Sequence, residues 1–287
     1  MRLLLLTTLT MLAFAGNSVL NRIAVGGGLV GPVEFAFWRV LSGAAMLAAL
    51  VLWRHLRSGG TIWPGGGGRL VGTAGLLAYL LGFSLAYVAL DAGTGALILF
   101  GTVQITMFAG ALWSREPVPH TRWLGAALAF CGLVILLAPG GGAAPEPFAA
   151  LCMVGAGAGW GLYSLSGRRQ SDALGATAAN FLLVTPLLGA VQLLGPPAPV
   201  PLANGGLALA IVSGAVTSGL GYALWYRILP ALGAGRAAVA QLTVPLIAAA
   251  GGLALLGEPM GLRFAVAAAL VLGGVALALS RGRRAGP

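Results

Sequence analysis

The sequence predicts an all-α membrane protein with ten transmembrane helices, arranged as two inverted five-helix repeats with both termini cytoplasmic. Three observations predict this fold class: the apolar composition, ten apolar runs of spanning length, and the similarity between the two halves of the chain. Of 287 residues, 59% are hydrophobic and 8% are charged, against roughly 25% charged in soluble domains. So few charged groups could not cover the surface of a soluble protein, whereas a protein embedded in a bilayer does not need them.

Glycine and arginine usage agree with a membrane protein and argue against a nucleic-acid-binding role. The chain contains 47 glycines, and small residues let transmembrane helices approach closely where lipid provides no hydrophobic drive for association. The net charge is +10, yet the sixteen basic residues are all arginines, placed mostly singly or in pairs between apolar runs. Nucleic-acid binders instead gather basic side chains on one face. We expect Cys131 and Cys152 to pack within apolar helices and not to bind a metal.

Ten apolar runs have the length of a spanning helix, which is about 20 residues. They cover residues 3–25, 33–53, 70–90, 93–113, 121–138, 147–167, 174–195, 204–226, 234–256 and 261–280. A glycine- and proline-rich segment divides the chain into a first five-helix repeat, 1–140, and a second, 141–287, which ends in a short basic tail. The first run could also pass for a cleaved signal peptide. A matching helix in the second half, which cleavage would leave without a partner, disfavours this alternative.

The arginines predict the orientation, because the cytoplasmic segments of membrane proteins carry the excess of positive charge. With a cytoplasmic N-terminus, thirteen of the sixteen arginines are cytoplasmic. The exceptions are Arg263 on the outer side and Arg22 and Arg39 in the outer halves of their helices. The sequence therefore predicts a multi-pass protein of the bacterial inner membrane with both termini in the cytoplasm.

The two halves of the chain are similar to each other. Residues 93–138 align without gaps with residues 235–280, and this alignment places Glu116–Pro117 on Glu258–Pro259. Because each half contains an odd number of helices, the two halves must have opposite orientations in the membrane. Inverted repeats are an architecture of secondary transporters, whose substrate site lies near the bilayer midplane between the halves.

The whole chain resembles the drug/metabolite transporter superfamily, specifically its EamA type with two five-helix repeats. The motifs that carry the resemblance are Ala15–Asn17 with Asn21, Phe37–Arg39, Glu116–Pro117, Gly159–Tyr163, Gly221–Tyr226, and Val244–Pro245 leading to Gly257–Pro259. Length and aromatic placement look most similar to the bacterial amino acid exporters, including the aromatic amino acid exporter branch. The resemblance implies a small-molecule substrate and a cavity lined by the third, sixth and ninth helices.

Aromatic and polar side chains at helical spacing indicate where a solute would bind. Rings that recur at i and i+4 share one helix face, and rings with a few amides and hydroxyls suit a neutral or aromatic amino acid. The predicted substrate-binding residues are Asn17, Asn21, Tyr79, Phe83, Thr102, Trp160, Tyr163, Ser164, Tyr222 and Gln241. Each has a structural alternative, since amides also bond neighbouring helices and rings also lie at the membrane interface. We expect the interface role for Tyr226.

The charged residues constrain the mechanism. Arg22 and Arg39 need a partner or water at membrane depth. They either attract a substrate carboxylate at the outer vestibule or form structural ion pairs and snorkel to the interface, and the structural alternative is favoured. All six acidic residues fall at helix ends or in loops, which disfavours proton antiport through a mid-membrane carboxylate and a strongly cation-selective site. No enzymatic constellation or ATP-binding motif is present, so we expect no enzymatic activity and no cofactor.

Pro186, Pro245 and Gly161 are the predicted hinge positions, because proline removes a backbone donor and favours a bend. We expect a monomeric exporter of small organic solutes, most specifically aromatic or large neutral amino acids, that works by alternating access. Its partners are then the lipid bilayer and a small-molecule substrate, with no nucleic acid and no metal. A passive channel, a non-transporting scaffold, and a transporter of another metabolite or of a lipid-linked substrate remain as alternatives.

Overall fold

A computed structural model of the chain describes residues 1–59, 61–63, 68–115, 119–138, 144–167, 170–198 and 200–280, without the side chains of 233–239 and 279–280. These residues form helices joined by short connections, with no strand in any of the described ranges. The elements are α1 Arg2–Asn21, η1 Arg22–Gly26, α2 Pro32–Ser58, α3 Arg69–Ala86, α4 Ala92–Trp113, α5 His120–Leu137, α6 Pro147–Gly167, α7 Ala173–Leu194, α8 Asn204–Val212, η2 Ser213–Leu220, α9 Gly221–Gln241, α10 Thr243–Leu256 and α11 Leu262–Ser280. The Glu116–Pro117 motif and the basic tail lie outside the described residues.

The prediction of a multi-pass helical membrane protein is confirmed, whereas the number of ten spans stays a prediction. Eight helical spans in the described residues are long and apolar enough to cross a membrane. They include α1 continued by η1 (Arg2–Gly26) and α8 continued through η2 into α9 (Asn204–Leu232). The remaining two predicted spans correspond to shorter apolar helices, α10 and α11.

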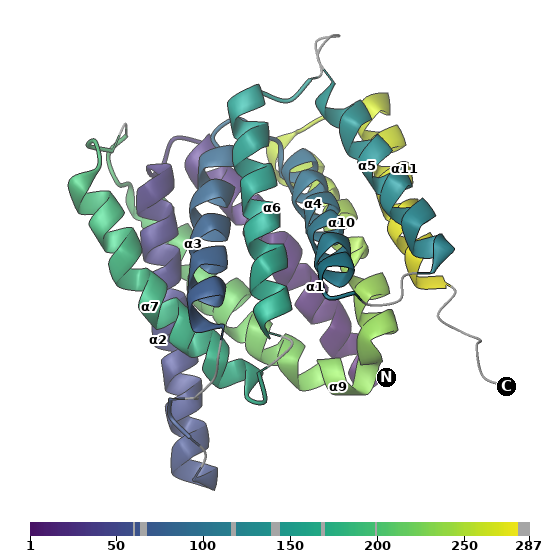
Figure 1. The fold of residues 1–287 in the computed structure, drawn as a ribbon. Helices are drawn as coiled ribbons and strands as arrows, with labels where there is room; N and C mark the ends of the chain where they lie inside the picture. The colour runs from purple at the N-terminus through teal and green to yellow at the C-terminus, as the bar shows by residue number, and fades with distance from the viewer. Residues whose placement is uncertain are drawn as a thin grey trace, which may run out of the picture.

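The structure differs from the predicted ninth span because the preceding helix, α9, extends beyond the predicted end of the eighth span. α9 continues through the connection expected at 227–233 and lies along the end of the bundle at which α1 begins (Figure 1). α10 then starts at Thr243 and has 14 residues, about 21 Å at 1.5 Å per residue against about 30 Å of bilayer hydrocarbon. Pro245 lies in its first turn and has no N–H to donate to the carbonyl of Gln241, which agrees with the break at Leu242.

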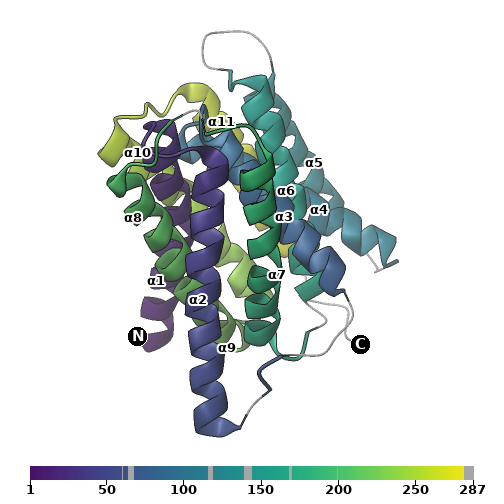
Figure 2. The ribbon, with the colours of Figure 1, turned by 90° about the vertical axis from the view of Figure 1, so that its left-hand side faces the viewer.

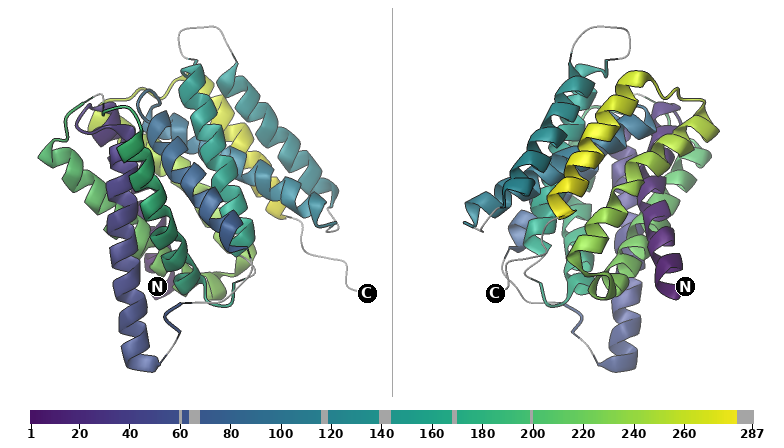
Figure 3. Two further views of the ribbon diagram at one scale, coloured as in Figure 1. Left: turned by 60° about the vertical axis from the view of Figure 1, so that its left-hand side comes forward. Right: turned by 90° about the vertical axis from the view of Figure 1, so that its right-hand side faces the viewer.

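The helices form a bundle with a peripheral pair. α5 and α11 lie side by side at one edge (Figures 1 and 3), while α2 extends beyond its neighbours at the end where α1 begins (Figures 1 and 2). We call this the α1-start end of the bundle, and the end where α1 finishes and α2 begins the α2-start end. Contacts between distant segments are made by α3 with α6, α4 with α6 and α10, α2 with α7, and α1 with α9 and α10.

Glycines bring these helices into backbone contact, as the composition predicts. A Cβ atom added to Gly159 of α6 would lie 2.6 Å from the carbonyl oxygen of Gly75 in α3. A Cβ atom on Gly274 of α11 would lie 2.5 Å from the carbonyl oxygen of Gly125 in α5. The two crossings therefore require glycine. Of the cysteines, Cys152 is partly buried, but Cys131 is exposed on α5, contrary to the packing role expected for it.

Candidate functional site

A pocket lies between α1, α3, α4, α6 and α9, and we call it the central pocket. Its empty volume is about 370 Å³. Its lining residues are mostly aromatic, with three small polar side chains and one leucine: Phe14, Asn17, Ser18, Tyr79, Phe83, Leu99, Phe100, Trp160, Tyr222 and Gln241. Six of the ten predicted substrate-binding residues are therefore brought together here, from four helices far apart in the sequence.

The rings of the central pocket contact one another. Trp160 lies at the centre of the cluster, with its ring centroid 4.9 Å from that of Tyr79 and 5.3 Å from that of Tyr222. Phe83 contacts Tyr79 at 5.2 Å, and Phe14 contacts Tyr222 at 5.7 Å. These are the distances of packed aromatic pairs. A solute that occupied the space between these rings would therefore have to separate them.

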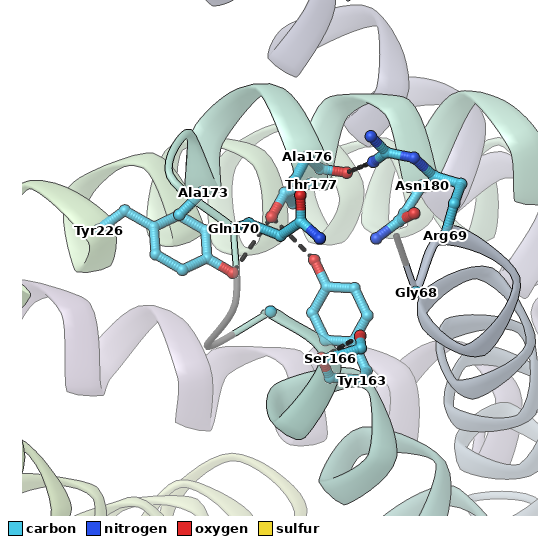
Figure 4. A pocket seen from close by; sticks show the side chains of 11 residues that line it. Gly68, Arg69, Tyr163, Ser166, Gln170, Ala173, Ala176, Thr177, Asn180 and Tyr226 are labelled. Carbon is cyan, nitrogen blue, oxygen red and sulfur yellow. Dashed lines mark hydrogen bonds between the residues drawn. The ribbon is translucent and has the colours of Figure 1, made fainter. Parts of the chain in front are cut away.

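A second pocket lies nearer the α1-start end, and we call it the Tyr163 pocket (Figure 4). Tyr163 and Tyr226 point toward Thr177, whose hydroxyl lies 2.8 Å from the Tyr163 hydroxyl and donates to that of Tyr226 over 3.1 Å. The Tyr163 ring stacks on Trp160 with centroids 5.2 Å apart. Because Trp160 lines the central pocket and Tyr163 lines the other, these two stacked rings separate the two pockets. Tyr226, expected at the membrane interface, belongs to this polar cluster.

Four predicted binding residues do not line the central pocket. Tyr163 lies across the ring stack, as described. Asn21 is buried and donates to Ser84 over 3.0 Å, and Ser164 donates to the backbone carbonyl of Trp160 over 2.7 Å. Thr102 lies on the face of α4 that packs against Gly157. Helical spacing predicts which residues share a face, but it does not say which neighbouring helix that face contacts.

Asn17 is held by hydroxyls that the sequence analysis largely missed. Its side-chain oxygen accepts hydrogen bonds from Ser213 (2.9 Å), Thr217 (2.6 Å) and Ser218 (3.2 Å). These residues belong to η2, a π-helix in which backbone bonds run from i to i+5, so positions 213 and 218 face the same way. None of the three hydroxyl residues is among the predicted substrate-binding residues.

Arg39 lies directly behind two residues of the central pocket. It is fully buried. Its Nη2 donates to the Tyr79 hydroxyl over 2.9 Å and its Nε to Ser218 over 3.3 Å, and its guanidinium carbon lies 4.9 Å from the Phe83 ring centroid. No ion pair to Arg39 occurs in the described parts of the chain. The favoured expectation of an ion pair or of snorkelling to the interface is therefore wrong for Arg39.

Arg22, in contrast, forms the expected structural ion pair. Its Nε lies 2.8 Å from Oε1 of Glu258, and its Nη2 lies 3.7 Å from Oδ1 of Asp91. The second oxygen of Glu258 accepts from the backbone N–H of Ala92, at the start of α4, over 2.8 Å. Burial and then the nearby Glu258 raise the pKa of Asp91, and Arg22 partly opposes this shift.

A second ion pair lies near the α1-start end. Arg54, in α2, donates to both carboxylate oxygens of Asp172 over 2.8 and 2.5 Å. Asp172 is also the N-cap of α7 and accepts from the N–H of Gly175 over 3.0 Å. The Arg54 guanidinium and then this backbone bond hold the pKa of Asp172 below its usual value, although burial opposes them.

The predicted hinge positions lie in three different settings. Pro186 is inside α7, and Pro245 is in the first turn of α10. Gly161 lies in the uninterrupted helix α6, where an added Cβ atom would approach the Cβ of Thr106 to 2.6 Å. Gly161 therefore allows close contact between α6 and α4 in this structure.

Comparison with known proteins identifies similar sequences over the whole chain. The EamA-like transporter family matches twice, over residues 1–138 and 147–280. An uncharacterized protein of Pseudomonas aeruginosa is 47% identical over 279 residues, which are 97% of this chain and 95% of that protein. A crystal structure covering 97% of this chain and 99% of its own has a TM-score of 0.65 at 20% identity. At that identity the likeness shows the fold alone.

Proposed function

Because the chain belongs to the EamA-like transporter family, we propose that it exports aromatic or large neutral amino acids by alternating access around the central pocket. The family consists of membrane transporters of small solutes and not of enzymes. We further propose a monomer in the bacterial inner membrane, with cytoplasmic termini and two inverted halves. The exported amino acid and the bilayer are its partners in this proposal.

The aromatic cluster of the central pocket carries the proposal of an amino acid substrate. Tyr79 comes from the first half of the chain, and Trp160 and Tyr222 come from the second. Rings supply apolar contact area, while the amides of Asn17 and Gln241 can orient a polar end group. This combination suits a solute with an apolar side chain and a compact polar head.

The two ion pairs support alternating access. Arg22–Glu258 and Arg54–Asp172 each join the first half of the chain to the second, at opposite ends of the bundle. Opening one end requires the halves to separate there, which breaks the pair at that end while leaving the other intact. The stacked rings of Trp160 and Tyr163 lie between the two pockets, in the place where a moving solute would have to displace them.

Transport by purified protein in liposomes tests the proposal. Uptake of radiolabelled L-phenylalanine, L-tryptophan and L-leucine would be measured with and without internal amino acid and with and without a pH gradient. We expect saturable uptake, lowered at least about tenfold by Trp160→Ala, because the variant removes the central ring of the cluster. The matched control is Trp113→Ala, since Trp113 is 92% exposed at the end of α4.

Each alternative function predicts a different result. Linear, non-saturating flux would indicate a passive channel. Absence of flux for every amino acid would exclude the proposed substrate class and favour another metabolite, a lipid-linked substrate or a scaffold. Indifference to the pH gradient would identify facilitated diffusion.

A further inference from the structure

Arg39 carries a positive charge that the fold buries without neutralising it. The side chain is 0% exposed and lies about 10 Å along α2 from the first residue, Pro32, at 1.5 Å per residue. The three ion pairs found in the described residues all involve other arginines. A buried arginine without a counter-charge is costly, and this cost calls for a compensating partner.

The neutral partners of Arg39 leave part of the guanidinium unsatisfied. A guanidinium has five N–H groups, and here one on Nη2 donates to Tyr79 and the one on Nε donates to Ser218. Nη1 has no hydrogen-bond partner among the residues that the structure describes. The rings of Phe83 and Tyr79 contribute cation–π contacts at 4.9 and 5.3 Å, which stabilise the charge but do not cancel it.

This unsatisfied charge is linked to the central pocket on two sides. Tyr79 and Phe83, which contact the guanidinium, line the pocket. Ser218, which accepts from Nε, donates in turn to Asn17, another lining residue. If the Tyr79 ring turned aside, the Nη1 and Nη2 fork would face the space that the ring had occupied.

We infer that Arg39 is the anion subsite of the central pocket and that the transported solute carries a carboxylate that binds it. The inference rests on the proposed transport function and names the chemical group that the site requires. The carboxylate accepts from Nη1 and replaces the Tyr79 hydroxyl on Nη2, in the two-bond geometry that a guanidinium and a carboxylate share. The solute then supplies the missing counter-charge, and its apolar part lies among the rings around Trp160.

The same charge excludes one class of solute. An aromatic cluster alone would attract organic cations through the faces of its rings. Here Arg39 already lies over the rings of Tyr79 and Phe83, so a cationic solute without a carboxylate is repelled. We therefore expect discrimination by charge among molecules of nearly the same shape.

Binding of four matched probes to the purified full chain tests this inference. The probes are L-phenylalanine, 3-phenylpropionate, L-phenylalaninamide and 2-phenylethylamine, and the readouts are ligand-induced thermal stabilisation and quenching of tryptophan fluorescence. We expect both carboxylates to bind at least about tenfold more tightly than the amide, the ratio given by one charged hydrogen-bonded contact, and no binding of the amine. Equal affinity of acid and amide would overturn the inference, and so would absence of binding by both acids.

Two variants attribute the discrimination to the guanidinium. Arg39→Gln is expected to lower the affinity for both carboxylates about tenfold without weakening the binding of the amide, so that the acid-over-amide ratio approaches one or falls below it. Ser218→Ala removes a neutral partner of Arg39 and keeps its charge, and the ratio should persist. A purely structural role of Arg39 predicts equal losses for acid and amide.

A third variant keeps the test decisive if Arg39→Gln fails to fold. Tyr79→Phe removes the hydroxyl that competes for Nη2, so the acid-over-amide ratio should equal or exceed that of the wild-type protein. A ratio that falls to one in Tyr79→Phe would contradict a carboxylate bound at Arg39.

The outcomes separate this inference from the proposed transport function. Carboxylate-selective binding without saturable flux in liposomes would support the anion subsite and contradict transport of these amino acids. Saturable flux without preference for the carboxylate would support transport and overturn the anion subsite.

Discussion

Arg22 and Glu258 lie 236 positions apart in the chain and form an ion pair, with 2.8 Å between Nε and Oε1. Glu258 also accepts from the backbone of Ala92, so a single carboxylate connects the end of α1 with the start of α4. The Arg54–Asp172 pair closes the other end of the bundle. Each end of the bundle is therefore bridged by an ion pair between the two halves of the chain.

Glu258→Gln should weaken the α2-start end of the bundle. The Glu258 side chain is 10% exposed, and its replacement leaves the largely buried Arg22 with the more distant and more exposed carboxylate of Asp91. We expect this to lower the stability of the folded protein by about 1–3 kcal/mol. The measurement is the midpoint of thermal unfolding in detergent. Asp91→Asn is the control, because Asp91 is 45% exposed and lies farther away, at 3.7 Å, and its effect should be smaller.

A double-mutant cycle tests whether the effect comes from the pair itself. Arg22→Gln combined with Glu258→Gln should be less destabilising than the sum of the single variants, by at least about 0.5 kcal/mol. Strict additivity would mean that the two side chains act independently.

Asp172 should make the stability of the protein depend on pH in acid. Its pKa is lower in the folded chain than the value of about 3.9 in an unfolded one, so the Arg54 pair stabilises the folded state fully above that value. The contribution is lost as the pH falls through the folded-state pKa. Asp172→Asn keeps a residue that caps α7 well and removes only the charge.

The measurement for Asp172 is the unfolding midpoint of the wild-type protein and of Asp172→Asn at a series of pH values. The difference between the two should be constant from about pH 7 to 5 and should shrink below about pH 4. A difference that grows on acidification would contradict this assignment.

Gly159→Ala should disturb the contact between α3 and α6. The added Cβ would lie 2.6 Å from the carbonyl oxygen of Gly75 and 2.9 Å from the backbone nitrogen of Tyr79. Both are backbone atoms, so the helices must move apart, at a cost of about 1–3 kcal/mol for overpacking. Such a movement also shifts Tyr79 relative to Trp160, so we expect lower thermal stability and slower uptake.

Gly155→Ala is the matched control on the same helix. No atom lies within 4 Å of the Cβ position at Gly155, and alanine favours a helix over glycine by about 1 kcal/mol. The variant should unfold at the same temperature as the wild-type protein or higher. Equal losses in the two variants would show that close packing at Gly159 is not the cause.

Pro245→Ala should slow transport more than it weakens binding. Alanine restores an N–H that can donate to the carbonyl of Gln241, which joins α10 to α9 across the break at Leu242. A continuous helix would bend less readily, so the turnover number of uptake should fall while the Kd for substrate changes little. Unchanged turnover would argue against a hinge at this position.

Helical periodicity predicted much of the site and also accounts for what it missed. Tyr79, Phe83, Trp160 and Tyr222 were selected by spacing within single helices, and all four line one pocket. Asn21 and Thr102 were selected as polar residues within apolar helices, but they contact Ser84 and the Gly157 region of neighbouring helices. The difference between the two groups depends on which helices pack together, and spacing within one helix carries no information about that.

The environment of Arg39 could not be derived from the sequence for a related reason. Its nearest acidic residue along the chain, Glu34, lies five positions before it, which is not the spacing of a helical ion pair. The actual partners of Arg39 are Tyr79 and Ser218, which are 40 and 179 positions away and lie in different helices. Folding alone brings these groups together.

The sequence by itself determined that the chain is a multi-pass helical membrane protein with glycine-mediated contacts. It could do so because the amino-acid composition and the length of the apolar runs are set by the hydrocarbon core of the bilayer. Its motifs also identified the family. Only the tertiary structure decided that α9 extends into the predicted ninth span and that η2 presents three hydroxyls to Asn17. It also decided that Arg39 is buried beside the central pocket, with no ion pair to any described residue. These features depend on contacts between helices. The sequence pattern shows only which parts of each single helix suit lipid or water, and not which helices pack together.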